Sequence, residues 1–240
     1  MQIDYATLES CGEPGGAVVV IDVLRSFTTA AYAFAAGACE ILPVASPDEA
    51  PALAARTPGA LTVGAIPGGW TIPGFDFGNS PAAIAAADLA GRRLILCTAG
   101  GVRGLAACAG ADLLLAGSMV CAAATARALL HSRAARVTLV ITGIYRDRDG
   151  DEDIACADYI AALLRGERPD PAPFEARVRA SDFGRRFVDP LHPATPSADL
   201  ELCAEADRFD FAMPVERRDD LLVMRAVDAP GASYATELCT

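Results

Sequence analysis

Short apolar runs rich in β-branched residues alternate with Ala-rich stretches along the first 165 residues of the chain. The clearest run is Ala17 to Ile21, which reads AVVVI, and four more occupy residues 39–44, 93–98, 113–116 and 137–142. A short strand that is apolar throughout is typical of a parallel sheet buried on both faces. Strands that alternate with helices pair mostly in parallel. We therefore predict an α/β fold with a mostly parallel sheet covered by helices.

The stretch after Ile21 predicts the first turn from strand to helix. A helix is expected from Ser26 until Gly37, where glycine favours helix termination. The ligands of such sheets bind at the carboxyl ends of the strands. Asp22, the segment 98–103, Ser118 and Thr142 are therefore expected at one edge.

Two segments depart from this alternation. Residues 57–81 are rich in Gly and Pro and are expected to cross the open edge of the sheet. Residues 165–210 are rich in Arg, Asp and Pro, and we expect short helices and loops near the C-terminal strands. Because no low-complexity linker marks a boundary, the prediction is one domain over residues 1–240.

Composition excludes several classes of protein. The net charge of -11 opposes a binding surface for nucleic acid, which needs clustered Lys and Arg. The eight cysteines are scattered, and Cys39, Cys97, Cys121 and Cys156 are interpreted as small buried hydrophobic residues. Only two histidines are present, which opposes a zinc site. Neither a signal peptide nor a membrane helix is recognisable, so we expect a soluble cytoplasmic protein.

Asp22 and Arg25 are the first candidate site residues. They place a carboxylate, a guanidinium and the hydroxyl of Ser26 within one turn at a strand end. Arg binds phosphate through two hydrogen bonds, and Asp binds hard cations such as Mg²⁺. The alternative is a capping Asp beside a surface Arg.

The loop GFDFGNSP at residues 74–81 supplies further candidates. Asn79 and Ser80 precede Pro81, an arrangement typical of a helix N-cap, so either capping or substrate binding explains them. Asp76 lies between two aromatic residues and could either fix the loop or bind a metal ion.

A glycine turn follows the run at residues 93–98. Its sequence TAGGVR brings Gly100 and Gly101 directly after a strand, where backbone N–H groups can approach an anion, and Arg103 adds positive charge. It is neither a Walker loop nor a dinucleotide-binding fingerprint.

The densest charge cluster is YRDRDGDED at residues 145–153. It lacks the closing Glu of a calcium-binding loop, since the twelfth position from Asp147 is Asp158. A solvated loop before a helix is one explanation. Alternatively, Glu152 and Asp153 complete a magnesium site with Asp22.

In this order, the motifs resemble those of the 2-phosphosulfolactate phosphatase family. The matching segments are VVVIDVLRSFTTA, GFDFGNSP, the glycine turn, AGSM at residues 116–119 and EDIACAD at residues 152–158. The resemblance implies a three-layer α/β/α fold with a mostly parallel or mixed sheet, a homodimer, and Mg²⁺-dependent hydrolysis of a small phosphorylated acid. The residues that match the family pattern are Asp22, Arg25, Asp76, Asn79, Ser80, Gly101, Arg103, Ser118, Glu152 and Asp153. On this basis we expect Asp22, Asp76, Glu152 and Asp153 to bind the metal ion, and Asp22, Arg25 and Glu152 to be catalytic. We expect the phosphate to be bound by Arg25, Asn79, Ser80, Gly101, Arg103 and Ser118, together with Ser26 and Gly100 of the two strand-end turns.

Several positions depart from the family pattern. The family turn Thr-Thr-Asn-Gly-Thr-Arg is TAGGVR here, and Cys121 replaces an expected Asn. Apolar groups therefore stand where polar ones are expected. A homologue that binds a small anion without turnover, or one with a shifted substrate, is the alternative hypothesis.

Overall fold

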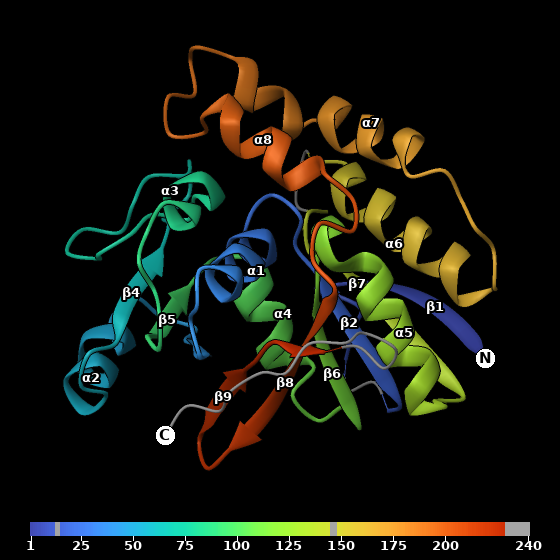
Figure 1. Cartoon of the computed structure of the whole chain (residues 1–240), viewed down its shortest axis with the longest axis horizontal. Helices are drawn as coiled ribbons and strands as arrows, with labels where there is room; N and C mark the ends of the chain where they lie inside the picture. Colours follow the sequence, from blue (N-terminus) through green and yellow to red (C-terminus); the bar gives the residue numbers. More distant parts are fainter. Residues whose placement is uncertain (13–14, 145–147, 229–240) are drawn as a thin grey trace.

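The computed structural model describes residues 1–12, 15–144 and 148–228. Its central feature is a mixed sheet with the strand order β1-β7-β2-β6-β8-β9-β3-β5-β4, and β10 pairs with β8 (Figure 1). The strands are β1 (Gln2–Thr7), β2 (Ala17–Ile21), β3 (Glu40–Pro43), β4 (Leu61–Gly64), β5 (Arg93–Cys97), β6 (Leu113–Gly117), β7 (Arg136–Ile141), β8 (Phe211–Arg218), β9 (Leu221–Met224) and β10 (Val227–Asp228). The predicted α/β/α fold with a mostly parallel or mixed sheet is confirmed.

Two parallel blocks of strands make up most of the sheet. In the first block β2 pairs in parallel with β6 and β7, and in the second β5 pairs in parallel with β3 and β4. The antiparallel strands β8 and β9 lie between the blocks. Ile21 is in register with both Gly117 and Ile141, so β2, β6 and β7 end at the same level.

Helices cover both faces of the sheet because its strands are apolar on both sides. Val18 and Val20 of β2 belong to one core, together with residues of α1 (Ser26–Ala35), α3 (Pro81–Ala85) and α4 (Gly101–Ala107). Val19 and Ile21 belong to the opposite core, with residues of α5 (Ala122–Ser132) and α6 (Asp151–Leu164). Helix α2 (Glu49–Arg56) packs on the second block through Leu53.

A helical segment covers the carboxyl ends of the first block. It contains α7 (Ala172–Ala180), the 3-10 helix η2 (Gly184–Val188) and α8 (Ser197–Ala204). Helix α7 packs on α6, and α8 packs on α7 and α3 (Figure 1). We predicted short helices here, correctly, but near the C-terminal strands. Their main contacts are instead with other helices, because the apolar residues Val178, Phe187 and Leu200 join the core around α6.

The other sequence predictions agree with the structure to differing degrees. All five predicted strands form within two residues of their predicted ends, and α1 ends just before Gly37. The segment 57–81 contains a strand that we missed, β4, and its residues Ala65 to Gly69 reach the edge of the sheet as expected. Cys97, Cys121 and Cys156 are buried, whereas Cys39 is only partly buried. Among the helices that the structure describes, none has the length and apolar character needed to cross a membrane.

Candidate active site

A cavity of about 530 Å³ opens at the carboxyl ends of the strands. Its walls come from the turns after β2, β4, β5 and β7 and from η2. Eight of the predicted site residues line it, namely Asp22, Arg25, Ser26, Asn79, Gly100, Arg103, Glu152 and Asp153. The structure therefore brings together residues that are up to 131 positions apart in the sequence.

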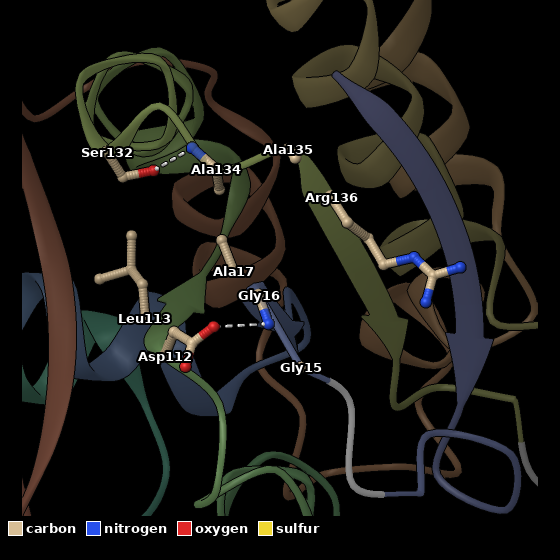
Figure 2. Close-up of a pocket in the computed structure, with 9 residues that line it drawn as sticks. All are labelled: Gly15, Gly16, Ala17, Asp112, Leu113, Ser132, Ala134, Ala135 and Arg136. Carbon is tan, nitrogen blue, oxygen red and sulfur yellow. Dashed lines mark hydrogen bonds between the residues drawn. The ribbon is translucent and has the colours of Figure 1, made fainter.

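A second cavity, of about 520 Å³, lies at the opposite end of the sheet, between the amino ends of β2, β6 and β7 (Figure 2). The carboxylate of Asp112 accepts a hydrogen bond from the backbone N–H of Gly16 over 3.0 Å there. Arg136 extends toward β1, where its Nε lies 2.9 Å from Asp4 Oδ2 (Figure 2). None of the predicted site residues lines this cavity, so the candidate site is the one at the carboxyl ends.

Asp22 is buried at the end of β2 and is fixed by three hydrogen bonds. Its Oδ1 accepts from the backbone N–H of Ser26 over 3.0 Å, and its Oδ2 accepts from the Ser26 hydroxyl over 2.6 Å and from the Gly101 N–H over 2.8 Å. Gly101 allows this approach, because a Cβ there would lie 3.0 Å from Oδ2 and 2.8 Å from the ring of Phe27. The glycine turn therefore binds the carboxylate of Asp22 through Gly101.

Asp153 joins the ends of β2 and β7 at the start of α6. Its Oδ1 accepts from the Val23 N–H over 2.8 Å, and its Oδ2 accepts from the Gly143 N–H over 2.7 Å and from both the N–H and the hydroxyl of Thr142. Burial, followed by the charges of Glu152 and Asp22, raises the pKa of Asp153 well above its ordinary value. The side chain is thus a buried acid whose oxygens are already satisfied by hydrogen bonds.

Glu152 is almost fully buried but only half satisfied. Its Oε1 lies 3.2 Å from a guanidinium nitrogen of Arg148, whereas its Oε2 has no hydrogen-bond partner among the residues that the structure describes. Burial raises the pKa of Glu152, and a backbone hydrogen bond and the Arg148 guanidinium offset only part of that rise. An unpaired buried oxygen that lines a cavity is available to a ligand.

Arg25 forms a buried ion pair that the sequence did not reveal. Its Nη1 lies 2.6 Å from Oδ2 of Asp199, a fully buried residue of α8. The other oxygen of Asp199 accepts from the Ser80 hydroxyl over 2.8 Å and from the Ala82 N–H over 3.0 Å. Asp199 therefore links α8, the start of α3 and Arg25 at one wall of the cavity. We missed it because it lies in the irregular segment 165–210, where no local pattern marks it.

Three more arginines reach the cavity. Arg103 projects from α4 as predicted, while Arg148 and Arg186 were not foreseen. The guanidinium carbons of Arg148 and Arg186 lie 4.0 and 5.3 Å from the ring centre of Phe183, which also lines the cavity. Cation–π contacts of this kind hold a guanidinium in place without neutralising its charge.

Four predicted residues lie outside the lining of the cavity. Gly101 and Ser80 lie next to it through their bonds to Asp22 and Asp199, and Ser80 also caps α3. Asp76 accepts two hydrogen bonds from Thr62, so its carboxylate fixes the loop to β4. Ser118 is fully buried, 2.5 Å from the Thr28 hydroxyl. The metal role of Asp76 and the phosphate role of Ser118 gain no support from these positions.

A metal ion at the cavity would need oxygen atoms that have no hydrogen-bond partner in the protein. Among residues 1–12, 15–144 and 148–228, no three His, Cys, Asp or Glu side chains form a ready-made metal site. Unpaired buried oxygens remain on Glu152 and on Asn79. Mg²⁺ commonly binds one or two protein carboxylates and fills its other positions with water and substrate oxygens. The donors at the cavity fit that kind of site better than a cage made of protein alone.

The fold and the cavity together define a class: an α/β protein whose strand ends carry a pocket of buried carboxylates and arginines suited to a small anion. Comparison with known proteins gives the family. The model of the 2-phosphosulpholactate phosphatase family matches residues 5–217, and the chain belongs to this family of phosphoric monoester hydrolases.

Several relatives are similar over nearly their whole length. A protein of Carboxydothermus hydrogenoformans is 41% identical, covering 88% of this chain and 90% of its own. A protein of Bacillus subtilis is 33% identical, covering 89% of this chain and 93% of its own. One of Prochlorococcus marinus is 31% identical, covering 92% of this chain and 99% of its own. All three are named probable 2-phosphosulfolactate phosphatase.

Proposed function

We propose that the protein is a phosphatase that hydrolyses a small phosphorylated acid, with 2-phosphosulfolactate as the first candidate substrate. The observation that carries the proposal is the cavity at the carboxyl ends, which gathers Asp22, Glu152 and Arg103 in a member of this phosphatase family. Hydrolysis adds water across the P–O bond and releases phosphate and the hydroxy acid.

Arg103 is proposed to bind the phosphoryl group. It lies in the glycine turn, and within the described chain it has no ion-pair partner that would neutralise it. A guanidinium at the cavity stabilises the charge that builds up on the phosphoryl and leaving oxygens in the transition state. Gly100 supports close approach, because it leaves the space above Asp22 Oδ2 free of a side chain.

Asp22 and Glu152 are proposed to act together at the floor of the cavity, with Asp153 holding the two strand ends beneath them. The three hydrogen bonds of Asp22 fix its carboxylate, so little reorganisation is needed when substrate binds. We assign Arg25 a smaller role in phosphate binding than we predicted from the sequence, because Asp199 already balances its charge.

Mg²⁺ is proposed as the cofactor. Glu152 would hold it through Oε2, and Asp22 and the amide oxygen of Asn79, which line the same cavity, are further candidate donors. A bound Mg²⁺ supplies positive charge to the phosphoryl oxygens and lowers the pKa of a coordinated water. The unpaired oxygens of Glu152 and Asn79 support this assignment, because both residues line the cavity, where a ligand can supply the missing partner.

A phosphate-release screen tests the proposal. The purified protein is assayed with 2-phosphosulfolactate, 2-phosphoglycolate and phospholactate, each with Mg²⁺ and with EDTA. We expect release from at least one substrate with Mg²⁺, and at least a tenfold lower rate with EDTA. Release that EDTA does not affect would reject the cofactor, and no release from any substrate by a folded protein would reject the phosphatase.

The alternative is a homologue that binds a small anion without turnover or acts on a different phosphoester. It is favoured by the apolar residues of the glycine turn and by Ser118, whose hydroxyl is bonded to Thr28. Phosphate binding without release in the same screen would support it. The homodimer and the cytoplasmic location stay predictions; light scattering on the purified protein tests the former.

A further inference from the structure

Two of the four arginines that line the cavity carry charge that no carboxylate balances. Arg25 is paired with Asp199, and Arg148 is paired with Glu152. Within the described ranges, Arg103 and Arg186 have no carboxylate at ion-pair distance. The chain has a net charge of -11, so acidic partners are plentiful. Two unpaired guanidiniums in one cavity therefore mark places for two anionic groups.

The surroundings of Arg186 hold its side chain at the cavity. Its guanidinium carbon lies 5.3 Å from the ring centre of Phe183, and Phe183 packs edge-on against the buried Phe187. The backbone oxygen of Arg186 accepts a hydrogen bond from the Thr195 hydroxyl over 3.0 Å. A guanidinium held in advance loses less conformational entropy when an anion binds.

Arg103 and Arg186 approach the cavity from opposite faces of the sheet. Val102 and Leu105, beside Arg103 on α4, belong to the core around α1. Phe183 and Phe187, beside Arg186, belong to the core around α6. Because they reach the cavity from opposite sides, the two guanidiniums are placed to bind different anionic groups of one ligand.

We propose that Arg186 is a specificity-determining residue that binds an acidic group, carboxylate or sulfonate, on the part of the substrate that is not transferred, while Arg103 binds the phosphoryl group. This inference takes its substrate class from the proposed function, and it assigns to Arg186 the selection of that substrate. The phosphoesters that the site favours are those with a carboxylate or sulfonate close to the ester oxygen. Simple alkyl phosphates leave Arg186 without an anion.

The two hydrolysis products probe the two arginines separately. Inorganic phosphate carries only the phosphoryl group, and 3-sulfolactate carries only the part of the substrate that is not transferred. We would measure the Kd of inorganic phosphate and of 3-sulfolactate by calorimetry, and kcat/KM on 2-phosphosulfolactate. Arg186→Ala should weaken 3-sulfolactate binding by about 10- to 100-fold, as expected for one charge-assisted contact, and should leave the Kd of phosphate within about twofold. Arg103→Ala should do the reverse.

Arg185→Ala is the matched control. It removes an arginine from the same 3-10 helix, but Arg185 is exposed, pairs with Asp182 and does not line the cavity, so both dissociation constants should stay unchanged. Arg186→Lys keeps the charge and should recover part of the affinity.

Each outcome decides between the inference and the proposed function. Equal weakening of both products by Arg186→Ala, or no weakening of either, overturns the role of Arg186. If the wild-type protein binds 3-sulfolactate in an Arg186-dependent way but releases no phosphate, the proposed function fails and the assignment of Arg186 stands. If the wild type does not bind 3-sulfolactate at all, the inference fails.

Discussion

The two cavities at opposite ends of the sheet have nearly the same volume, about 520 and 530 Å³, but very different walls. The amino-end cavity is lined mainly by small residues, and the carboxylate of Asp112 accepts a hydrogen bond from the backbone N–H of Gly16. The carboxyl-end cavity collects carboxylates and arginines, several of them buried. The volume of a cavity therefore does not identify a site. Its charged groups, and whether each has a partner, do.

The largest expected effect comes from Asp22→Asn. It preserves the shape of the side chain but removes its charge, so we expect kcat to fall about 10³-fold, a loss in the range seen when one transition-state contact is removed. Thermal unfolding followed by circular dichroism checks that the fold is kept. Asp112→Asn makes the same change in the amino-end cavity and should leave kcat within about twofold. Equal losses in the two variants would remove the distinction between the cavities.

Asp199→Ala should have the next largest effect, on stability. It leaves the Arg25 guanidinium buried without a carboxylate, and breaking a buried ion pair costs about 3–5 kcal/mol. Urea unfolding measures the free energy directly. Asp189→Ala, a partly exposed carboxylate in the same segment that accepts one backbone hydrogen bond, should change it by less than about 1 kcal/mol. A change below 1 kcal/mol in Asp199→Ala would mean that the ion pair does not hold this wall of the cavity.

Gly101→Ala tests the close packing at the carboxyl ends. The new methyl group would lie 2.8 Å from Phe27 and 3.0 Å from Asp22 Oδ2, so overpacking should cost about 1–3 kcal/mol and disturb the bond that Gly101 donates to Asp22. We expect the loss of kcat, expressed as a free energy of activation, to exceed the loss in the free energy of unfolding. Gly110→Ala is the control, because a Cβ there meets no atom within 4 Å. If both variants were equally active, Asp22 would not depend on the glycine turn.

The smallest effect is expected from Glu40→Gln, at the amino end of β3. Burial raises the pKa of Glu40, but hydrogen bonds from Arg93 and Arg225 outweigh it, and the net shift is downward. Its contribution to stability is therefore present above the pKa of the unfolded chain and is lost as the pH falls through the lower folded value. Since the arginines are partly exposed, we expect a loss of about 1 kcal/mol at pH 7, with unchanged kcat. Urea unfolding at pH 7 and pH 3 should show the difference from wild type shrinking at the lower pH.

The sequence predicted those parts of the molecule that depend on local pattern. The apolar run before Asp22 predicted β2, and the rule that ligands bind at the carboxyl ends of parallel strands placed Asp22 and Gly100 at one edge, where both line the cavity. Asp199 and Arg186 were not predicted, because their positions depend on how the segment 165–210 folds back over the strands. Ser118 lies at the predicted edge, but its hydroxyl is hydrogen-bonded to that of Thr28 and does not line the cavity.

The position of β8 and β9 in the sheet has a consequence for the order in which the molecule is built. These strands come near the end of the described chain, yet they fill the gap between β6 and β3. During synthesis both parallel blocks emerge from the ribosome with an unpaired inner edge, and such edges favour aggregation. The sheet is completed only when residues 211–224 are available. Insertion of residues 211–224 between β6 and β3 is therefore the step that pairs both inner edges and joins the two blocks.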